Sequence, residues 1–376
     1  MSMRASVCSR LGIAITILFA LALPSRAAEL PDATQRILAD LKLDASVLDG
    51  LDRELVVPDA WIAGAKKEGT FRITGSWDPS QFTTMTAPFV ARYPYIKPVF
   101  ARGSNNDRAL KPILAFSQGR YITDIVSGME GNLPQYLKAD ALDDLRILPN
   151  AKNVPDGMKS ADGAWIGIRI RYWCMSYNTD KVTRAELPAT WEDLLTQTTW
   201  RDGRLAVNNL PQIWMLQLWG KKGKAWVEQY SQTLFRDVRP QLRKEGTNAL
   251  LSLVIAGEFY GAIPSADYRL WRYAQKGAPV GWHCPTPVPS AVSAFGILKG
   301  NPNIDAARLF LNWLLSKEGQ IAQFHADNAT PVHKDLQTRS FLSFPDEIVG
   351  KELAFRDPSL DRLNDELMEI WSPFWQ

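Results

Sequence analysis

The sequence predicts an α/β fold of two lobes, and three observations lead to this prediction. Short β-rich runs alternate with helical runs along most of the chain, which is typical of βαβ units on a largely parallel sheet. The chain has 376 residues, and single cores usually divide above roughly 250 to 300 residues. A β-rich stretch at 168–177 and an extended passage with Pro285, Pro287 and Pro289 separate two sets of βα units. We therefore expect two lobes joined by two crossings of the chain.

Residues 1–27 predict a secretory signal peptide. Arg4 and Arg10 precede an apolar run from Leu11 to Leu23, and small residues follow it at the spacing of a cleavage site. This run is shorter than the roughly 20 residues that a membrane-spanning helix needs, and no second such run follows. We expect a mature chain that begins near Ala28, resides in a bacterial periplasm and has no membrane anchor. An uncleaved N-terminal helix is the alternative.

Removal of the signal peptide changes the net charge, because that segment carries three arginines and no acidic residue. It leaves 40 of the 43 basic residues, against 40 acidic residues. A net charge near zero without a basic block predicts no nucleic-acid partner and no binding to anionic membranes. Small solutes and proteins are the expected partners.

The elements expected before the long β-rich stretch are a helical extension and the first part of lobe 1. In the extension, residues 28–56, the side chains of Ile37, Leu38 and Leu41 share one helical face. Lobe 1 is expected to begin with residues 57–173. Its strands are expected at 70–75, 96–101 and 122–127, and its helices at 82–93, 109–117 and 133–139.

Residues 174–284 are expected to form lobe 2. A helix is expected to start at Thr190, because a threonine hydroxyl accepts a backbone N–H there and Glu192 and Asp193 complement the helix dipole. Further strands are expected at 204–208 and 260–264, and helices at 213–219 and 248–256.

The chain is then expected to return to lobe 1 over residues 285–335, with a strand at 292–298. The clearest amphipathic helix of the whole sequence follows at 304–315, where Phe310, Leu311 and Leu314 share one face. Residues 336–376 are expected to form a C-terminal helical segment with a last helix at 360–371.

Several short segments, in order along residues 57–335, carry a resemblance to a known family. They are Ala65-Lys66-Lys67-Glu68-Gly69, Thr123-Asp124-Ile125-Val126, Tyr177-Asn178-Thr179-Asp180, Leu187 to Leu195, Ala256-Gly257-Glu258, Lys276 to Val280 and Ser316 to Gln320. Together they resemble the extracellular (periplasmic) solute-binding proteins of ABC importers, family 1, in the group that contains the ferric-iron-binding proteins.

This resemblance implies a two-lobed periplasmic binding protein fold of type II-like topology. Each lobe would be a mixed, mostly parallel sheet flanked by helices, and the lobes would close on a ligand. It also implies a monomer without a cofactor, which captures a small solute and delivers it to an ABC permease in the inner membrane.

Loops at the carboxyl ends of the predicted strands are the expected ligand-binding positions, because strand ends and helix N-termini meet a ligand there in open α/β sheets. The residues selected in this way are Ser76, Trp77, Arg102, Ser104, Asn105, Gly128, Glu130, Asn208, Ser265, Asp267 and Tyr268. Arg102 is the candidate for a carboxylate or phosphate group. Ordinary turn chemistry, packing or surface solvation is the alternative for each residue.

Two kinds of ligand remain open. A small anionic or zwitterionic solute, such as a phosphonate or phosphate ester, would suit Arg102 beside Glu130 and Asp267. Ferric-iron members of the family that this chain resembles bind metal through oxygen ligands, often adjacent tyrosines. Only Tyr268 and Glu130 could fill those roles here, because Asp267 stands where the other tyrosine would be.

Cys174 and Cys284 are the two cysteines of the expected mature chain. They flank the two predicted crossings, so a disulfide near the hinge is one hypothesis, and two buried free thiols are the alternative. The three histidines show no metal-ligand spacing.

Two other functions compete with solute delivery. A secreted enzyme on the same scaffold could use Glu130 and Asp267 as acid and base, but the sequence contains no Gly-x-Ser-x-Gly, His-Glu-x-x-His or Walker motif. A ligand-sensing partner of a receptor would use the same closure. We expect a binding protein and no enzyme.

Overall fold

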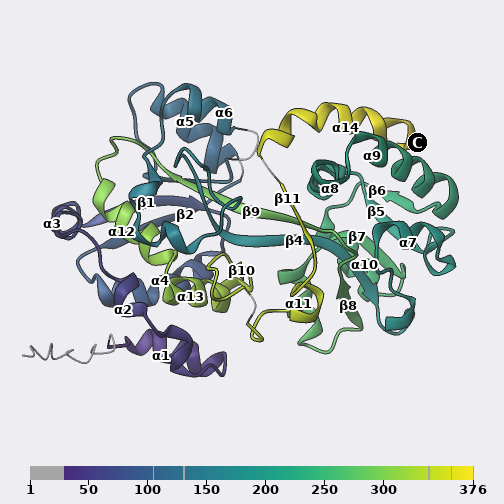
Figure 1. Cartoon of the computed structure of the whole chain (residues 1–376), viewed down its shortest axis with the longest axis horizontal. Helices are drawn as coiled ribbons and strands as arrows, with labels where there is room; N and C mark the ends of the chain where they lie inside the picture. The colour runs from purple at the N-terminus through teal and green to yellow at the C-terminus, as the bar shows by residue number, and fades with distance from the viewer. Residues whose placement is uncertain (1–28, 105, 130–131, 338, 357, 376) are drawn as a thin grey trace, which may run out of the picture.

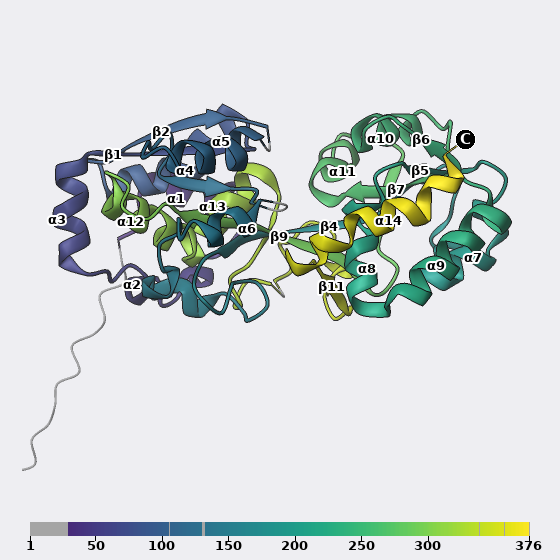
Figure 2. The ribbon, with the colours of Figure 1, turned by 90° about the horizontal axis from the view of Figure 1, so that it is seen from above.

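The computed structural model describes residues 29–104, 106–129, 132–337, 339–356 and 358–375. The predicted signal peptide lies outside these residues. The described chain forms an α/β structure of two lobes, which lie on either side of the long strand β4 (Ile166–Asn178) and strand β9 (Val288–Ile297), as Figures 1 and 2 show. The α/β prediction is confirmed.

The strands of the two lobes form one continuous hydrogen-bonded series in the order β2-β1-β3-β9-β4-β7-β5-β6. The parallel pairs are β1 with β2 and β3 in lobe 1, and β5 with β6 and β7 in lobe 2. Between them β9 runs antiparallel to β3 and β4, and β4 runs antiparallel to β7. Strand β4 serves both lobes, because its first half pairs with β9 and its second half with β7 and β8.

Lobe 1 is built on strands whose side chains alternate between the core and more accessible positions, as in Thr70–Gly75. Its strands are β1 (Thr70–Gly75), β2 (Lys97–Arg102), β3 (Ile125–Ser127) and β10 (Thr330–Pro331). Its helices are α3 (Asp59–Glu68), α4 (Pro79–Arg92), α5 (Lys111–Phe116), α6 (Leu133–Lys138), α12 (Ile304–Leu314) and α13 (Lys317–Asp327). In the core, Phe71 stacks on Phe310, and Phe89 meets both rings edge-on. Trp313 lies beside Phe310.

Lobe 2 has its own tryptophan-rich core around Trp191 and Trp214, whose ring centroids are 4.9 Å apart. Its strands besides β4 are β5 (Leu205–Asn208), β6 (Gln241–Arg243), β7 (Gly261–Ala266) and β8 (Val280–His283). Its helices are α7 (Trp191–Thr196), α8 (Met215–Lys222), α9 (Lys224–Thr233), α10 (Thr247–Ile255) and α11 (Asp267–Ala274). The predicted helix start at Thr190 is confirmed, because its hydroxyl accepts the Asp193 N–H at 3.2 Å.

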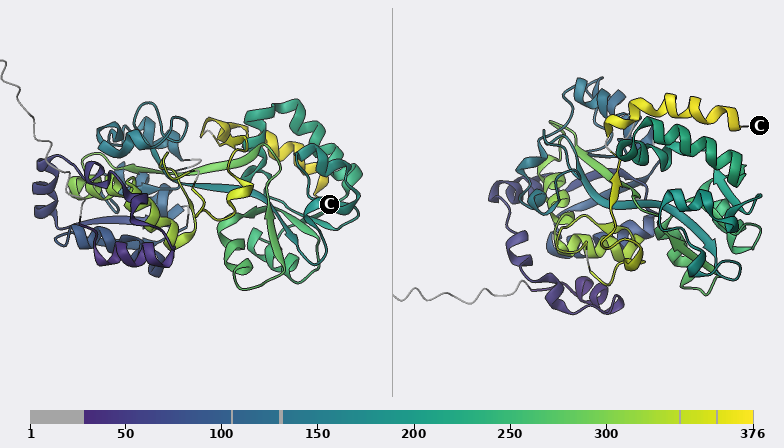
Figure 3. Two further views of the ribbon diagram at one scale, coloured as in Figure 1. Left: turned by 60° about the horizontal axis from the view of Figure 1, so that its bottom comes forward. Right: turned by 45° about the vertical axis from the view of Figure 1, so that its right-hand side comes forward.

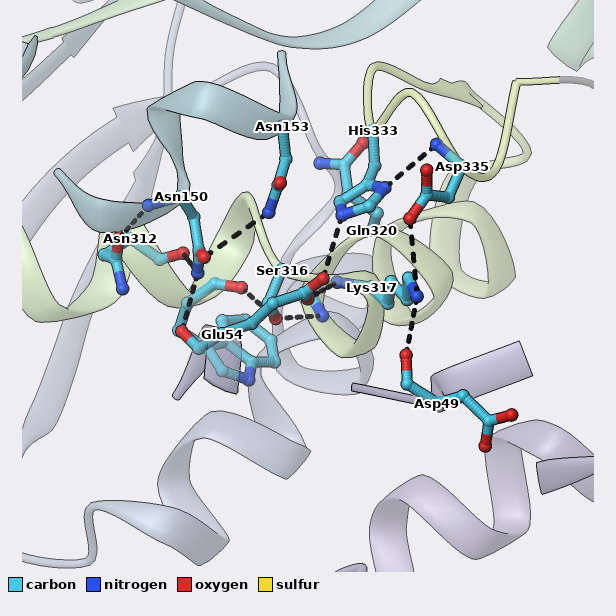
Figure 4. A network of polar contacts seen from close by, with 12 residues as sticks. Asp49, Glu54, Asn150, Asn153, Asn312, Ser316, Lys317, Gln320, His333 and Asp335 are labelled. Carbon is cyan, nitrogen blue, oxygen red and sulfur yellow. Dashed lines mark hydrogen bonds and ion pairs between the residues drawn. The ribbon is translucent and has the colours of Figure 1, made fainter. Parts of the chain in front are cut away.

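The N-terminal extension is helical, as predicted, with α1 (Asp32–Asp40) and α2 (Leu51–Glu54), and it docks on lobe 1. Glu54 joins it to α13 and the following loop: its carboxylate accepts the Lys317 N–H at 2.8 Å and lies 3.1 Å from His333 Nε2 (Figure 4). The Asp335 N–H donates to His333 Nδ1 at 3.2 Å, so the imidazole proton is on Nε2. The Asn150 amide donates to the Glu54 carbonyl at 2.8 Å.

The C-terminal segment differs from the expected helical tail, because it crosses between the lobes a third time. Strand β11 (Leu353–Phe355) pairs in parallel with β9, and α14 (Asn364–Trp371) then packs on α9 of lobe 2, as Figures 1 and 3 show. A strand of three residues in a polar stretch carries no readable alternation. The third crossing therefore emerges only from tertiary pairing.

Cys174 in β4 and Cys284, just after β8, form a disulfide beside this crossing. The Glu347 carboxylate accepts the Cys284 N–H at 3.1 Å, and Lys351 Nζ donates to the Cys284 carbonyl at 2.8 Å. Two side chains of the C-terminal segment, Glu347 and Lys351, thus connect it to the backbone of the disulfide-bonded Cys284.

Candidate functional site

A cleft of about 880 Å³ opens between the lobes, with β4 and β9 at its floor. Among the residues that the structure describes, ten charged residues line it, eight basic and two acidic, and this imbalance gives the described lining a positive charge. The basic residues are Arg102, Arg108, Arg169, Arg171, Arg269, Arg272, Lys276 and Arg356, and the acidic residues are Asp78 and Asp327.

Arg169, on β4, is buried at the floor of the cleft, and each nitrogen of its guanidinium has a polar partner. It pairs with Asp327 through Nη1, donates to Ser76 Oγ through Nη2 at 2.8 Å, and donates to Ser293 Oγ through Nε at 3.2 Å. Its guanidinium also covers the Trp77 ring at 4.6 Å. Burial lowers the pKa of Arg169 to about 10, so it stays protonated at neutral pH. Arg169 therefore has a structural role, because it connects three separate segments at the floor of the cleft.

Arg171 lies two residues further along β4, so its side chain points to the same face of the strand. Its Nη2 donates to Asp327 at 3.1 Å, and its guanidinium carbon lies 4.1 Å from the centre of the Tyr268 ring. Its Nη1 has no hydrogen-bond partner among the described residues. Since Arg169 and Arg171 share one carboxylate, the floor has an excess positive charge and a donor without a partner.

Asp327, the last residue of helix α13, contacts several side chains at the floor of the cleft. Besides the two arginines it accepts the Trp77 Nε1–H at 3.1 Å, and its second oxygen accepts the Ala329 N–H at 3.0 Å. Helix α13 ends here because Asn328 adopts a left-handed conformation with φ 54°. A carboxylate at a helix C-terminus is opposed by the helix dipole, so Asp327 depends on the cations around it.

Asp267 is the first residue of α11 and is fully buried behind the cleft wall. Neither of its carboxylate oxygens has a hydrogen-bond partner in the part of the chain that the structure describes. Burial raises its pKa from 3.8 to about 7, against the opposing effect of Arg171. Asp267 thus changes protonation state near neutral pH.

The structure brings five of the residues selected from the sequence to the cleft. They are Ser76, Trp77, Arg102, Gly128 and Tyr268. Their roles differ, however, from those expected. The Trp77 side chain is buried under Arg169 and holds Asp327, and Arg102 forms an ion pair with Asp78 at 2.7 Å.

Four other selected residues do not line the cleft. Besides Asp267, Ser104 donates to the Asp107 carboxylate at 2.6 Å, which is turn chemistry. The Asn208 amide donates to the Glu245 carbonyl at 2.6 Å, and Ser265 donates to Ser176 Oγ at 2.8 Å inside lobe 2. Asn105 and Glu130 lie outside the described residues.

Of the eight basic residues that line the cleft, sequence reasoning selected only Arg102 and missed the other seven. Arg169 and Arg171 alternate with isoleucines in a strand that is otherwise apolar, and buried arginines of this kind need partners. That alternation was a readable signal. The segment from Ser265 to Tyr268 was interpreted as a loop, whereas β7 ends at Ala266 and α11 begins at Asp267.

A metal site of the usual kind is not formed by the described residues, among which no group of three or more histidine, cysteine or acidic side chains comes together. The Tyr268 ring lies beneath Arg171, and its hydroxyl accepts the Arg269 Nε–H at 3.4 Å. Two cations thus surround the one described residue of the expected iron set. No helix within the described ranges is long and apolar enough to span a membrane.

Comparison with known proteins gives one family and several similar folds. A profile of bacterial extracellular solute-binding proteins matches residues 85–348. Iron uptake protein A2 of Synechocystis sp. (strain ATCC 27184 / PCC 6803 / Kazusa) is 27% identical over 199 residues, which are 48% of this chain and 56% of that protein. The chain thus spans little more than half the length of this curated relative.

Two solved structures share the fold at low sequence identity. A putative extracellular solute-binding protein from Bordetella parapertussis is 20% identical with a TM-score of 0.70, covering 82% of this chain and all of that one. The Trichodesmium protein IdiA (FutA), in complex with iron and citrate ligands, is 20% identical with a TM-score of 0.66, covering 82% of this chain and 99% of that one. The type II-like two-lobed prediction agrees with these folds.

Proposed function

Because the chain belongs to the family of bacterial extracellular solute-binding proteins, we propose that it captures a small anionic solute in the cleft between its lobes. The solute is of the phosphonate, phosphate-ester or carboxylate class. Delivery to an ABC permease of the inner membrane from the periplasm completes the proposed role. The protein binds and releases its solute unchanged, so the proposal includes no catalysis.

The positive charge of the cleft is the single observation that carries this proposal. In the described lining of the cleft, eight basic residues against two acidic ones disfavour a bare cation and favour an anion. Arg171 is the residue best placed to bind it, because it lines the cleft and its Nη1 has no hydrogen-bond partner in the described part of the chain. A guanidinium recognises carboxylate and phosphate oxygens through paired hydrogen bonds.

Closure follows from contacts with both lobes. A solute held between lobe 1 residues such as Ser76 and lobe 2 residues such as Tyr268 stabilises the closed arrangement by its differential contacts. The assignment of residues 57–173 and 285–335 to one lobe and 174–284 to the other remains a prediction, as do the monomeric state and the choice between a permease and a sensory receptor.

Ferric iron bound as a complex with an anionic chelator is a second candidate. The relative named for iron uptake supports it, and a chelate of net negative charge suits the basic cleft better than a bare ferric ion. Tyr268 and Tyr273 line the cleft and offer phenol oxygens, which are suitable ligands for a hard cation.

Isothermal titration calorimetry of the purified protein with inorganic phosphate, methylphosphonate, citrate and ferric citrate tests both candidates. We expect an anion to bind, and Arg171→Gln to weaken that binding at least about tenfold. Arg171→Lys keeps the positive charge but removes the planar guanidinium, so it shows whether binding needs only the charge or also the paired hydrogen bonds. Arg184→Gln, an exposed arginine of lobe 2 outside the cleft, is the matched control.

The proposal of an anionic solute is wrong if none of these anions binds while neutral sugars or free cations do. The iron candidate requires a visible phenolate-to-iron band with ferric citrate that Tyr268→Phe removes. Binding of citrate or phosphate without colour favours the anionic solute alone.

A further inference from the structure

Helix α11 presents two different faces. On one face Leu270 is fully buried, and Trp271 packs edge-on against Phe344 of the C-terminal crossing with 5.1 Å between ring centroids. This packing anchors the helix in lobe 2. The opposite face lines the cleft with Arg269 and Arg272, and Lys276 continues it just beyond the helix end. These positions follow the i, i+3, i+7 spacing of one helical face.

This α11 basic face (Arg269, Arg272 and Lys276) has no acidic partner among the residues that the structure describes. Arg269 donates only to the hydroxyl of its neighbour Tyr268, at 3.4 Å. Arg102, Arg169, Arg171 and Arg356, which also line the cleft, each have an acidic partner, as Arg102 has in Asp78 at 2.7 Å. The α11 basic face therefore carries three positive charges that are left to solvent or to a ligand.

The α11 basic face begins beside the cleft floor. Tyr268 connects the two regions, because its ring lies 4.1 Å from the guanidinium carbon of Arg171. A helix rises about 1.5 Å per residue, so the Arg272 Cα lies roughly 6 Å further along the α11 axis than the Tyr268 Cα. Lys276 follows beyond the helix end, which is at Ala274. One cleft therefore contains two separate positions for anionic groups.

We propose that the α11 basic face is a second anion-binding subsite and that the solute carries at least two anionic groups, separated by roughly 6 Å or more. This inference rests on the proposed function and specifies its ligand. One anionic group binds to Arg171 at the floor, and the other binds to Arg272 and Lys276 on the wall of lobe 2.

The physical reason is the fate of the charges when the lobes close. Closure removes water from the cleft, and unpaired positive charges then lose their hydration without compensation. A solute with one anionic group neutralises only one of the two positions. A solute with two groups neutralises both, so the bound and closed state is favoured for dianionic and larger anions.

Matched synthetic anions test the inference. Propylphosphonate carries one phosphonate group, and alkane bisphosphonates from propane-1,3-bisphosphonate to octane-1,8-bisphosphonate carry two at increasing separation. In calorimetric titrations, one bisphosphonate of the series should bind at least about tenfold more tightly than propylphosphonate. This gain exceeds the factor of about two that follows statistically from two equivalent phosphonate groups. The same titrations with linear dicarboxylates distinguish phosphonate-type from carboxylate-type recognition.

The double variant Arg272→Gln/Lys276→Gln removes two exposed charges from the α11 basic face. It should abolish the bisphosphonate advantage: the affinity ratio of the best bisphosphonate to propylphosphonate should fall to about two, although both affinities decrease with the reduced positive charge of the cleft. Arg184→Gln/Lys244→Gln, which neutralises two exposed residues of lobe 2 outside the cleft, should keep the advantage. Circular dichroism and melting temperature verify that both variants fold.

Equal affinities for one and two phosphonates, or an advantage that survives in Arg272→Gln/Lys276→Gln, would overturn the second subsite while leaving the anionic solute intact. If no phosphonate, dicarboxylate, phosphate or citrate binds to the wild-type protein, the proposed function itself is wrong. The two failures are therefore distinguishable.

Discussion

Single residues at the floor of the cleft are held by one shared carboxylate. Asp327 accepts hydrogen bonds from Trp77 and Arg171 and pairs with Arg169, and its side chain is 3% exposed. Removal of one partner from a buried ion pair leaves the other charge uncompensated. The stability of the floor is therefore tied to this residue more than to either arginine alone.

We expect Asp327→Asn to lower the free energy of unfolding by about 3 kcal/mol, because the buried Arg169 and the partly buried Arg171 lose their counter-charge. Urea unfolding followed by tryptophan fluorescence measures this loss. Asp156→Asn changes a fully exposed carboxylate, 3.6 Å from Lys159, and should leave the urea midpoint unchanged. An unaltered urea midpoint for Asp327→Asn would show that the ion pairs of Asp327 with Arg169 and Arg171 contribute nothing to stability.

Asp267 is a second single residue with an effect on stability, and its carboxyl group makes the free energy of unfolding depend on pH. Its pKa is about 7 in the folded protein against an ordinary value of 3.8, so the folded state binds more protons than the unfolded state between these values. Stability from this group is therefore lost as pH rises through that interval and is present below it.

Asp267→Asn should remove this pH dependence. Relative to wild type, the free energy of unfolding of the variant should rise by roughly 2 to 3 kcal/mol between pH 5 and pH 8. Urea unfolding of both proteins at pH 5, 6, 7 and 8 measures the difference, in which the contributions of all other groups cancel. A constant difference across this range would contradict the raised pKa.

Among the elements, helix α14 is the one that ties the C-terminus to lobe 2. Trp371 is fully buried, its Nε1–H donates to Ser231 Oγ at 3.0 Å, and its ring meets Phe235 edge-on at 5.2 Å. The helix thus closes the third crossing by inserting one large aromatic side chain into the core of lobe 2.

We expect Trp371→Ala to destabilise the protein by about 4 kcal/mol, because it leaves a large cavity in a packed core. Trp375, which is 39% exposed beyond the helix, is the control, and Trp375→Ala should have little effect. Differential scanning calorimetry of both variants measures the two changes. Equal melting temperatures would show that α14 is not a stable part of lobe 2.

The elements also differ in how well the sequence predicts them. Strand β1 at 70–75 and helix α12 were readable, because each buries one regular face. Helix α13 was not, since Gln320 and Gln323 are buried and donate to the Ile168 carbonyl, which obscures its apolar face. Helix α11 was also missed, because its basic face looks like a polar loop.

At the scale of the whole molecule, three crossings connect the lobes and the disulfide Cys174–Cys284 lies beside the third. The positive cleft between them is the place where a solute would bring the lobes together. Closure should therefore depend on an anion and on the residue that receives it at the floor.

Small-angle X-ray scattering measures this closure directly. We expect the radius of gyration to fall when a binding anion from the calorimetric series is added, because the lobes approach one another. Arg171→Gln at the same anion concentration should retain the larger radius, and Arg184→Gln should close as wild type does. A radius that does not change on saturation of the wild-type protein would contradict closure on the ligand.

Local periodicity and short ordered motifs were enough to predict the α/β class, the order of most strands and helices, the long shared strand and the family. The sequence also pointed to Ser76, Trp77, Arg102, Gly128 and Tyr268 near the cleft. The charge of the cleft could not be predicted in this way, because it depends on residues brought together by folding, such as Arg171 and Asp327, which are 156 positions apart. Burial and long-range pairing set which polar groups remain unpaired, and neither is encoded in local spacing.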